Sequence, residues 1–487
     1  MLKMKDETLL RADAHVDGAW LGAKSGERFA VTNKATGEVL AEVADMDAED
    51  TERAIDAANA AWPGWRAKTA KERAGLMRKW FELIMANQED LARLMTAEQG
   101  KPLAETRGEV AYGASFIEWF AEEGKRVYGD VIPTFAAGKR VLVLKEPIGV
   151  VAAVTPWNFP NAMITRKAGP ALAAGCTFII KPAAETPLSA TALAELAHRA
   201  GIPKGVINVV TSDKAAEVGK VLTTHPLVRK FSFTGSTEVG RLLMAQCAST
   251  IKKVSLELGG NAPFIVFDDA DLDAAADGAM LSKYRNMGQT CVCANRLLVQ
   301  ESVYDKFAAK LAGRVAKLKV GNGMDEGVMQ GPLISGDAVE KVERLLGDAK
   351  AKGAKIVQGG NRHPLGGTFF EPTVVTGVTP AMDIAQEEIF GPVATLFRFR
   401  DEAEAIRIAN ATEYGLAAYF YTRDIGRVMR VAEALEYGII GINEGIISSE
   451  VAPFGGMKQS GIGREGSKYG IEDFLEIKYV LLGGLNA

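Results

Sequence analysis

Two of the four cysteines in the chain, Cys291 and Cys293, lie one residue apart in the polar segment 288–296. This segment, Gly-Gln-Thr-Cys-Val-Cys-Ala-Asn-Arg, falls between a helical pattern and an expected strand. Buried structural cysteines usually lie within apolar runs, so a thiol at a polar turn indicates a nucleophile. A redox thiol pair and simple packing are the alternatives to that interpretation.

Asn158 and Glu257 are two further side chains with suitable chemistry for a carbonyl substrate. Asn158 stands between two prolines in residues 155–160, directly after an expected strand. A restrained backbone would hold its amide rigidly as a donor to an oxyanion, although a lone asparagine near proline is more often a turn residue. Glu257 lies in an apolar strand before a Gly-Gly turn. Burial there would raise its pKa and suit a general base, whereas the alternative is an ordinary ion pair at the end of a strand.

Two glycine-containing segments have spacings found in phosphate-binding loops. Residues 235–240, Gly-Ser-Thr-Glu-Val-Gly, follow the strand-like residues 230–233 and open a helix, whose backbone N–H groups could face a pyrophosphate. An ordinary capped turn is an equal alternative, and Arg241 stands where a P-loop would need lysine. Residues 461–466 match Gly-x-Gly-x-x-Gly, but no apolar strand precedes them. A chance match or a turn is the better interpretation.

The composition is that of an ordinary globular protein. The 487 residues are 47% hydrophobic and 24% charged, and a net charge of −4 with no basic tract gives no indication of nucleic-acid binding. Four scattered cysteines do not suggest a disulfide framework and favour a reducing, cytoplasmic location. We expect neither a secretory signal nor a membrane span, because no apolar run is long enough. The four histidines are widely spread, and we expect no metal site.

Alternating strands and helices are expected to position these residues. The pattern predicts strands at 149–154, 177–181, 205–210 and 230–233, and helices at 164–174, 190–200 and 238–247. This alternation is typical of a parallel, doubly wound sheet. A second alternating set runs from about 262 to 445, so we expect two α/β domains joined by residues 254–260.

The first 145 residues show mainly helical patterns. A helix should begin near residue 48 and end before Pro63, because proline disfavours the helical conformation of the preceding residue. Further helical patterns cover 76–86 and 103–120, and residues 140–145 are typical of a strand.

The combined motifs resemble the aldehyde dehydrogenase superfamily over almost the whole chain. The matching segments are 155–160, 177–187, 233–240, 256–261, 288–291, 387–392 and 453–456. The resemblance implies an aldehyde dehydrogenase-like fold of two doubly wound α/β domains and a small β oligomerisation arm. It implies a cofactor-binding domain over 1–126 and 146–256, a catalytic domain over 257–447, an arm from 127–145 and 474–487, and a return segment over 448–473.

The resemblance also implies a role for each site residue. Cys291 would be the nucleophile, Glu257 the base and Asn158 the oxyanion donor, with a thiohemiacetal and then a thioester on the cysteine. The remaining family positions are expected to bind the cofactor: Trp157, Lys181, Ala184, Gly235, Ser236, Glu388 and Phe390. Apart from the resemblance, a regulatory disulfide between Cys291 and Cys293 is compatible with this enzyme, which makes Cys293 the candidate for redox regulation. The family forms dimers or tetramers, so we expect a homo-oligomer.

Several segments are similar to the succinate-semialdehyde dehydrogenases of that superfamily. These segments are 164–167, 284–286, 291–293 and 444–449. The similarity implies that Arg166, Arg285 and Ser448 hold the distal carboxylate of a small semialdehyde, as paired guanidinium donors can. Glutarate-semialdehyde dehydrogenases carry very similar segments, and one methylene is a weak discriminator.

Cofactor preference depends on the residue three positions after Lys181. Relatives that prefer NAD often have glutamate there, which repels a 2′-phosphate, whereas this chain has Ala184. Glu185 is one residue later, and its side chain should point elsewhere. We therefore expect NADP to be accepted and preferred, with use of NAD as well.

Overall fold

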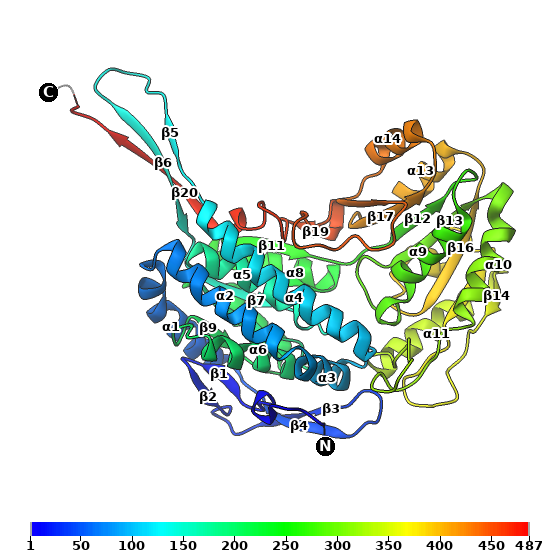
Figure 1. The fold of residues 1–487 in the computed structure, drawn as a ribbon, viewed down its shortest axis with the longest axis horizontal. Coiled ribbons are helices and arrows are strands. Elements are labelled where there is room, and N and C mark those ends of the chain that lie inside the picture. The colour runs from blue at the N-terminus through cyan, green and yellow to red at the C-terminus, as the bar shows by residue number, and fades with distance from the viewer. Residues whose placement is uncertain (1, 486–487) are drawn as a thin grey trace.

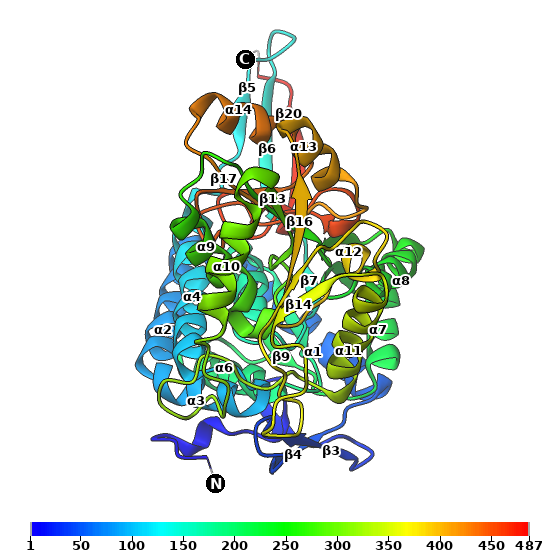
Figure 2. The same cartoon turned by 90° about the vertical axis from the view of Figure 1, so that its right-hand side faces the viewer.

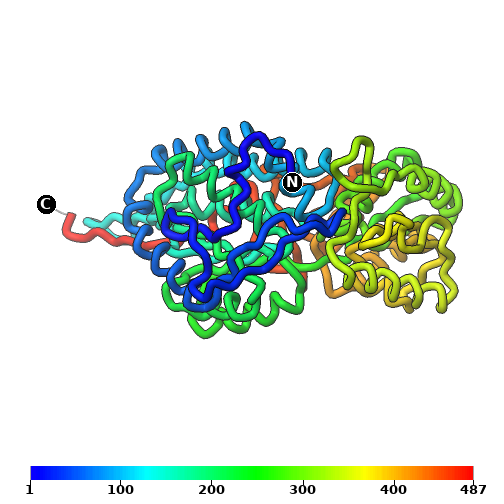
Figure 3. Tube along the Cα trace, turned by 90° about the horizontal axis from the view of Figure 1, so that it is seen from below, coloured from blue at the N-terminus to red at the C-terminus, as the bar shows by residue number. Residues whose placement is uncertain are grey.

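The computed structural model describes residues 2–485 and places two α/β units side by side, with a narrow β-sheet projecting from one end (Figures 1 and 3). The predicted fold class is confirmed: each unit is built around its own largely parallel sheet. Residue 1, in the predicted cofactor-binding domain, and residues 486–487, in the predicted arm, lie outside the described residues.

The first sheet has the strand order β19-β11-β10-β7-β8-β9-β1-β2. Its central strands are parallel: β7 (Val150–Val154), β8 (Thr177–Lys181), β9 (Ile207–Val209), β10 (Val228–Thr234) and β11 (Lys253–Glu257). The edge strands are antiparallel to their neighbours: β1 (Ala14–Val16), β2 (Ala19–Leu21) and β19 (Gly461–Ile462). All residues of β8 are buried, which explains its continuous apolar run in the sequence.

Helices pack on both faces of this sheet. One face carries α1 (Ala48–Arg66), α7 (Ala215–Thr224) and α8 (Thr237–Cys247). The other carries α5 (Ala162–Ala174) and α6 (Pro187–Arg199), with α2 (Ala70–Ala86), α3 (Gln88–Gln99) and α4 (Leu103–Glu123) packed outside them. Alternate residues of β7 and β8 enter the two cores, as the pleat of a strand requires.

The predicted end of α1 before Pro63 is wrong, because the helix continues through the proline to Arg66. Trp65 is buried, and its indole Nε1 donates to Leu172 O at 3.2 Å. This anchoring of the last turn outweighs the local cost of proline, since tertiary packing contributes more to a helix than intrinsic propensity does.

The second sheet has the order β14-β15-β16-β13-β12-β17-β18. Its strands are β12 (Ala262–Val266), β13 (Ala294–Gln300), β14 (Lys355–Gln358), β15 (Thr373–Thr376), β16 (Val393–Phe399), β17 (Ala417–Tyr421) and β18 (Ile439–Ile442). Figure 2 shows α9 (Leu272–Tyr284) and α10 (Tyr304–Val315) on one side of β16 and α11 (Gly336–Ala351) on the other. The helices α12 (Asp383–Gln386), α13 (Glu402–Asn410) and α14 (Ile425–Ala434) complete the unit. Because β11 still belongs to the first sheet, the chain crosses between the sheets over residues 258–261.

The projecting sheet joins distant parts of the chain. Its strands are β5 (Asp130–Ile132), β6 (Arg140–Pro147) and β20 (Leu475–Leu482), in the order β20-β6-β5. Apolar side chains on it face solvent, including Val131, Ile477 and Tyr479 at 75%, 70% and 59% exposure. A separate hairpin pairs β3 (Arg28–Thr32) with β4 (Val39–Ala44) near the N-terminus.

Candidate active site

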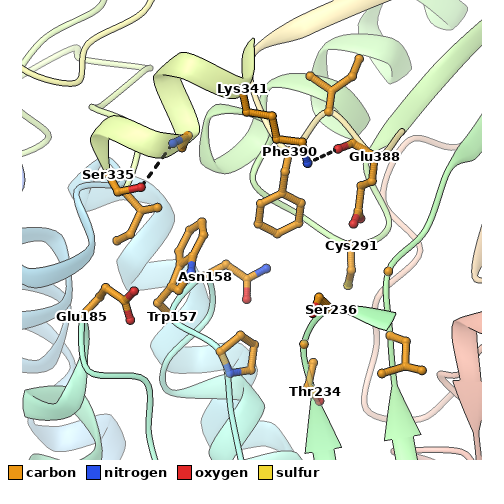
Figure 4. A pocket seen from close by; sticks show the side chains of 17 residues that line it. Trp157, Asn158, Glu185, Thr234, Ser236, Cys291, Ser335, Lys341, Glu388 and Phe390 are labelled. Atoms are coloured by element: carbon orange, nitrogen blue, oxygen red, sulfur yellow. Dashed lines mark hydrogen bonds between the residues drawn. The ribbon is translucent and has the colours of Figure 1, made fainter. Parts of the chain in front are cut away.

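A cavity of about 350 Å³ lies between the two units, and residues of both units form its wall (Figure 4). The first unit contributes Pro156, Trp157, Asn158, Glu185, Thr234, Gly235 and Ser236, and the crossing segment contributes Leu258 and Gly259. The second unit contributes Cys291, Ile334, Ser335, Ala338, Lys341, Glu388, Ile389 and Phe390. The fold thus brings together most of the predicted nucleophile, oxyanion and cofactor residues. Sequence reasoning missed the α11 residues and those just before them.

The topology of the first sheet explains this location. The chain continues from β7 to β8 on one side and from β10 to β11 on the other, while β7 and β10 are neighbours. Loops that leave such a pair of strands diverge and open a crevice at the carboxyl edge of the sheet. Residues 155–158 follow β7 and residues 235–236 follow β10, so both segments border the crevice.

A strained turn positions Cys291. Asn286, Met287 and Gly288 have φ values of 50°, 56° and 75°, in the left-handed region. A Cβ on Gly288 would lie 2.1 Å from Gly391 O, so only glycine fits there. Asn286 holds the turn, since its Nδ2 donates to Asn158 O at 3.0 Å and to Gln289 O at 3.1 Å. Backbone strain of this kind persists where surrounding contacts enforce it, commonly at functional sites.

Of the two neighbouring thiols, Cys291 lines the cavity, whereas Cys293 is buried outside its lining. Cys293 Sγ donates to Lys283 O at 3.3 Å. Burial raises the pKa of both thiols, that of Cys291 to about 12. The negative charge of Glu388 adds to this rise, and the positive charge of Arg166 opposes it. The resting Cys291 is therefore a neutral thiol at physiological pH, and its reaction with a carbonyl requires loss of the proton.

The Asn158 amide has a free N–H pointing into the site. Its Nδ2 donates one hydrogen bond, to Gln289 O at 3.1 Å, and an amide nitrogen carries two protons. The Asn158 backbone is fixed through its carbonyl oxygen, which accepts from Lys101 Nζ at 2.6 Å as well as from Asn286. In Figure 4 the Asn158 amide points toward the part of the cavity that contains Cys291.

Glu257 is buried at the end of β11, and its Oε2 has no hydrogen-bond partner. Burial raises its pKa well above the ordinary value, and the charge of Glu465 adds to the shift. Lys167 pairs with Glu465 and donates to Thr234 Oγ1 at 2.7 Å. Glu465 belongs to the segment 461–466, which forms the edge strand β19 and a turn rather than a phosphate-binding loop. The sequence offered no signal for this buried cluster.

The three predicted carboxylate-binding residues lie on separate elements. Arg166, in α5, is buried against the Phe454 ring at 4.0 Å, with its Nε 2.5 Å from Glu465 Oε2 and its Nη2 unpartnered. Arg285 follows α9 and lies over the Phe159 ring at 5.3 Å. Ser448 is half-buried in the segment after β18. The positive charges of both guanidinium groups lower the pKa of Cys291, so both groups lie close enough to the thiol to act on it electrostatically.

Five of the predicted cofactor residues line the cavity: Trp157, Gly235, Ser236, Glu388 and Phe390. Trp157 and Phe390 meet edge to face, with ring centroids 5.6 Å apart. Glu388 Oε1 accepts from Gly260 N at 3.2 Å, and burial raises the pKa of Glu388 to about 7. Ser236 caps α8 by accepting from Val239 N at 3.3 Å, which places Gly235 and Ser236 at the start of the helix.

Lys181 and Ala184 lie beside the cavity rather than in its wall. Lys181 is buried at the carboxyl end of β8, and Ala184 is half-buried in the loop that follows. Glu185, one residue later, lines the cavity, whereas Ala184 does not, so the two neighbouring positions face different surroundings (Figure 4).

Residues 20–480 match the aldehyde dehydrogenase family. The chain belongs to this family. It is 65% identical over 484 residues to the glutarate-semialdehyde dehydrogenase of Pseudomonas aeruginosa, with 99% of this chain and 100% of that protein aligned. It is also 65% identical over 482 residues to the succinate-semialdehyde dehydrogenase (NADP(+)) of Escherichia coli, with the same coverage.

The crystal structure of succinate-semialdehyde dehydrogenase from Burkholderia pseudomallei has the same fold as this aldehyde dehydrogenase. The two superpose with a TM-score of 0.98 at 64% identity, over 99% of this chain and 100% of that one. Within residues 2–485, no helix is both long and apolar enough to span a membrane. The same residues contain no group of three or more His, Cys, Asp or Glu side chains arranged to hold a metal ion.

Proposed function

We propose that this aldehyde dehydrogenase oxidises succinate semialdehyde to succinate with reduction of NADP or NAD. The observation that supports it most directly is that Cys291, the Asn158 amide and the loops after β7 and β10 meet around one cavity, with two arginines near the thiol. Glutarate semialdehyde is the alternative substrate, since relatives of both names are equally similar to the chain.

The first chemical step belongs to Cys291. Its thiol first loses its proton to solvent water, and the resulting thiolate attacks the aldehyde carbon. The carbonyl oxygen becomes an oxyanion that the free N–H of Asn158 stabilises. The geometry of Asn158 is preorganised, because its backbone and one amide proton are already bound. A nicotinamide held by Glu388, Phe390 and Trp157 would supply the hydride acceptor for the next step, and the re-formed carbonyl would remain joined to Cys291 as a thioester.

Glu257 acts on the second step as a general base. It takes a proton from the water that attacks the thioester, so that the acid product and the Cys291 thiol are released. A raised pKa suits this role, because it makes the ionised carboxylate a stronger base, which can take a proton from water near neutral pH.

The donor set of the cavity fits a dinucleotide cofactor. Gly235 and Ser236 at the start of α8 would hold the pyrophosphate, since helix N-termini favour anions. Glu388 would accept from the nicotinamide ribose, and Phe390 and Trp157 would contact the nicotinamide. Lys181 would bind the adenosine ribose, and Ala184 places no carboxylate against a 2′-phosphate.

A single assay tests the proposal. Purified enzyme is given succinate semialdehyde, glutarate semialdehyde or butanal with each cofactor, with and without a thiol reductant, and reduced nicotinamide is measured by absorbance. We expect the carboxylated aldehydes to be used far better than butanal. Absence of oxidation of all three aldehydes under reducing conditions would contradict the proposed activity.

Loss of either arginine should discriminate between charged and uncharged aldehydes. Arg166→Ala and Arg285→Ala each remove a charge-assisted contact worth about 1.5–3 kcal/mol, or about 10- to 100-fold in kcat/KM for succinate semialdehyde. Butanal makes no such contact and serves as the control substrate. Arg285 is the cleaner position, because Arg166 also pairs with Glu465. Equal losses on both substrates would show that the arginines support the fold instead.

We further propose that the projecting sheet pairs subunits in a dimer or tetramer. Deletion from Glu476 onward removes most of β20, which leaves the edge of β6 unpaired and apolar. We expect the truncated chain to aggregate or to form an unstable monomer in sedimentation experiments. Deletion of residues 483–487, which follow β20, is the control and should preserve the oligomer. A stable, active truncated monomer would refute this role.

The four free cysteines fit a reducing, cytoplasmic location for the assembly.

A further inference from the structure

Tyr112 has a buried hydroxyl group that the proposed mechanism does not use. It lies in α4, outside every segment that carries the family resemblance. The hydroxyl oxygen is shielded from solvent and has no hydrogen-bond partner among the described residues. By contrast, the hydroxyl groups of four other buried tyrosines each donate to a backbone carbonyl: Tyr284, Tyr304, Tyr419 and Tyr437. A buried hydroxyl without a partner costs free energy, so a bound acceptor is expected at Tyr112.

Packing between α4 and α5 fixes Tyr112 relative to Arg166. The Phe116 ring meets the Tyr112 ring edge to face, with centroids 5.0 Å apart, and the Arg166 guanidinium lies 5.5 Å from the same Phe116 ring. Gly113 lets the two helices approach closely, since a Cβ there would lie 3.3 Å from Ala162 N. Tyr112 and Arg166 therefore share Phe116 as a common neighbour on adjacent helices (Figure 1).

Charged groups of the active site act on Tyr112. Burial raises the pKa of Tyr112, and the positive charges of Arg166 and Arg285 oppose this rise. The negative charges of Glu465 and of an ionised Cys291 add to it. Tyr112 is therefore a neutral O–H donor at physiological pH, within electrostatic range of both arginines and the nucleophile.

Arg166 also has a buried donor without a partner. Its Nη2 donates to none of the described residues, although its Nε lies against Glu465. A guanidinium N–H and a phenolic O–H thus lack an acceptor on the two helices that meet at Phe116. A carboxylate oxygen satisfies both donors with charge-assisted hydrogen bonds.

We propose that Tyr112 is a further specificity-determining residue, whose hydroxyl donates a hydrogen bond to the distal carboxylate of the semialdehyde. The inference rests on the proposed function, in which Arg166 and Arg285 hold the same carboxylate. An ionised carboxylate has enough lone pairs to accept from guanidinium groups and a hydroxyl together. The contact is equally strong in bound substrate and transition state, because the reacting carbon is at the other end of the molecule. It therefore lowers KM and leaves kcat unchanged.

Tyr112→Phe tests this directly, because it removes the hydroxyl and keeps the ring against Phe116. We expect KM for succinate semialdehyde to rise about tenfold, with kcat within about twofold of wild type, as for loss of one hydrogen bond to a charged group. Butanal has no carboxylate, so its kcat/KM should stay unchanged. Steady-state kinetics with both aldehydes at saturating NADP measures these values.

Tyr304→Phe is the matched control for loss of a buried hydroxyl. Tyr304 does not line the cavity, and its hydroxyl donates to Leu396 O at 3.0 Å. This variant should lower Tm and keep the wild-type preference for succinate semialdehyde over butanal. Tyr112→Phe should change the preference without lowering Tm, because its hydroxyl has no partner within the protein.

Calorimetric titration with succinate gives a readout that needs no catalysis. Succinate should bind Tyr112→Phe about tenfold more weakly than wild type, and Tyr304→Phe should bind it as wild type does. Unchanged KM and unchanged succinate affinity in Tyr112→Phe would overturn the role of Tyr112 and leave the proposed function standing. Equal losses on succinate semialdehyde and butanal would also overturn it, because the hydroxyl would then serve the fold or the reacting carbonyl.

The succinate titration also separates this inference from the proposed function. A wild type that oxidises no semialdehyde but binds succinate, with weaker binding in Tyr112→Phe, would contradict the proposed function and support Tyr112 as a carboxylate donor. A wild type that neither oxidises a semialdehyde nor binds succinate would overturn both.

Discussion

Cys291→Ala is expected to lower aldehyde oxidation by about 10³-fold or more, since removal of a covalent nucleophile leaves only binding and electrostatic contributions. Cofactor binding should remain close to wild type, because the thiol is one small side chain in a wall of many. Steady-state kinetics measures the first effect, and calorimetric titration with NADP measures the second.

Cys293→Ala is the matched control for the nucleophile. Cys293 is buried outside the cavity lining, so this variant should keep its activity. We also expect it to avoid formation of a Cys291–Cys293 disulfide when treated with peroxide, which mass spectrometry under non-reducing conditions would detect. An inactive Cys293→Ala enzyme beside an active Cys291→Ala enzyme would reverse the assignment.

Glu257→Gln is expected to slow turnover by about 10²- to 10⁴-fold, the usual contribution of a general base. If Glu257 acts on thioester hydrolysis, the first turnover should still reduce cofactor. Rapid mixing would then show a burst of reduced nicotinamide close to one equivalent per active site, followed by a slow steady state. Loss of the burst together with the steady state would place Glu257 before thioester formation instead.

The pH dependence gives a second test of Glu257. A raised pKa means that the carboxyl is largely protonated at the low end of the working range and ionises as pH increases. Turnover of the wild type should therefore rise with pH as this carboxyl ionises, above the usual range for glutamate, and Glu257→Gln should lose this rise. Glu98→Gln is the control, since Glu98 is another buried carboxyl whose pKa burial raises to about 7, but it caps α6 through Leu188 and Ser189. Glu98→Gln should lower Tm and leave the pH profile of the folded enzyme unchanged.

Much of the fold follows from local pattern. β8 coincides with its expected range, and β7, β10, α5 and α8 lie within two residues of theirs. Central parallel strands are buried on both faces, so their short apolar runs and the turns that follow stand out in the sequence. Edge strands such as β1 and β19 were not predicted, because they are short and their burial depends on neighbours that are distant in the chain.

The sequence by itself determined the family resemblance, the alternating α/β pattern and the identity of Cys291, Asn158 and Glu257 as candidates, because these depend on residue type and local spacing. Only the tertiary structure decided which thiol faces the cavity, since Cys291 and Cys293 share one polar turn and differ in what packs against them. It also decided that Glu465 lies within the charge cluster of Lys167, and that Glu185 enters the cavity. Long-range packing and loop conformation set both positions, and neither produces a periodic pattern of residues in the sequence.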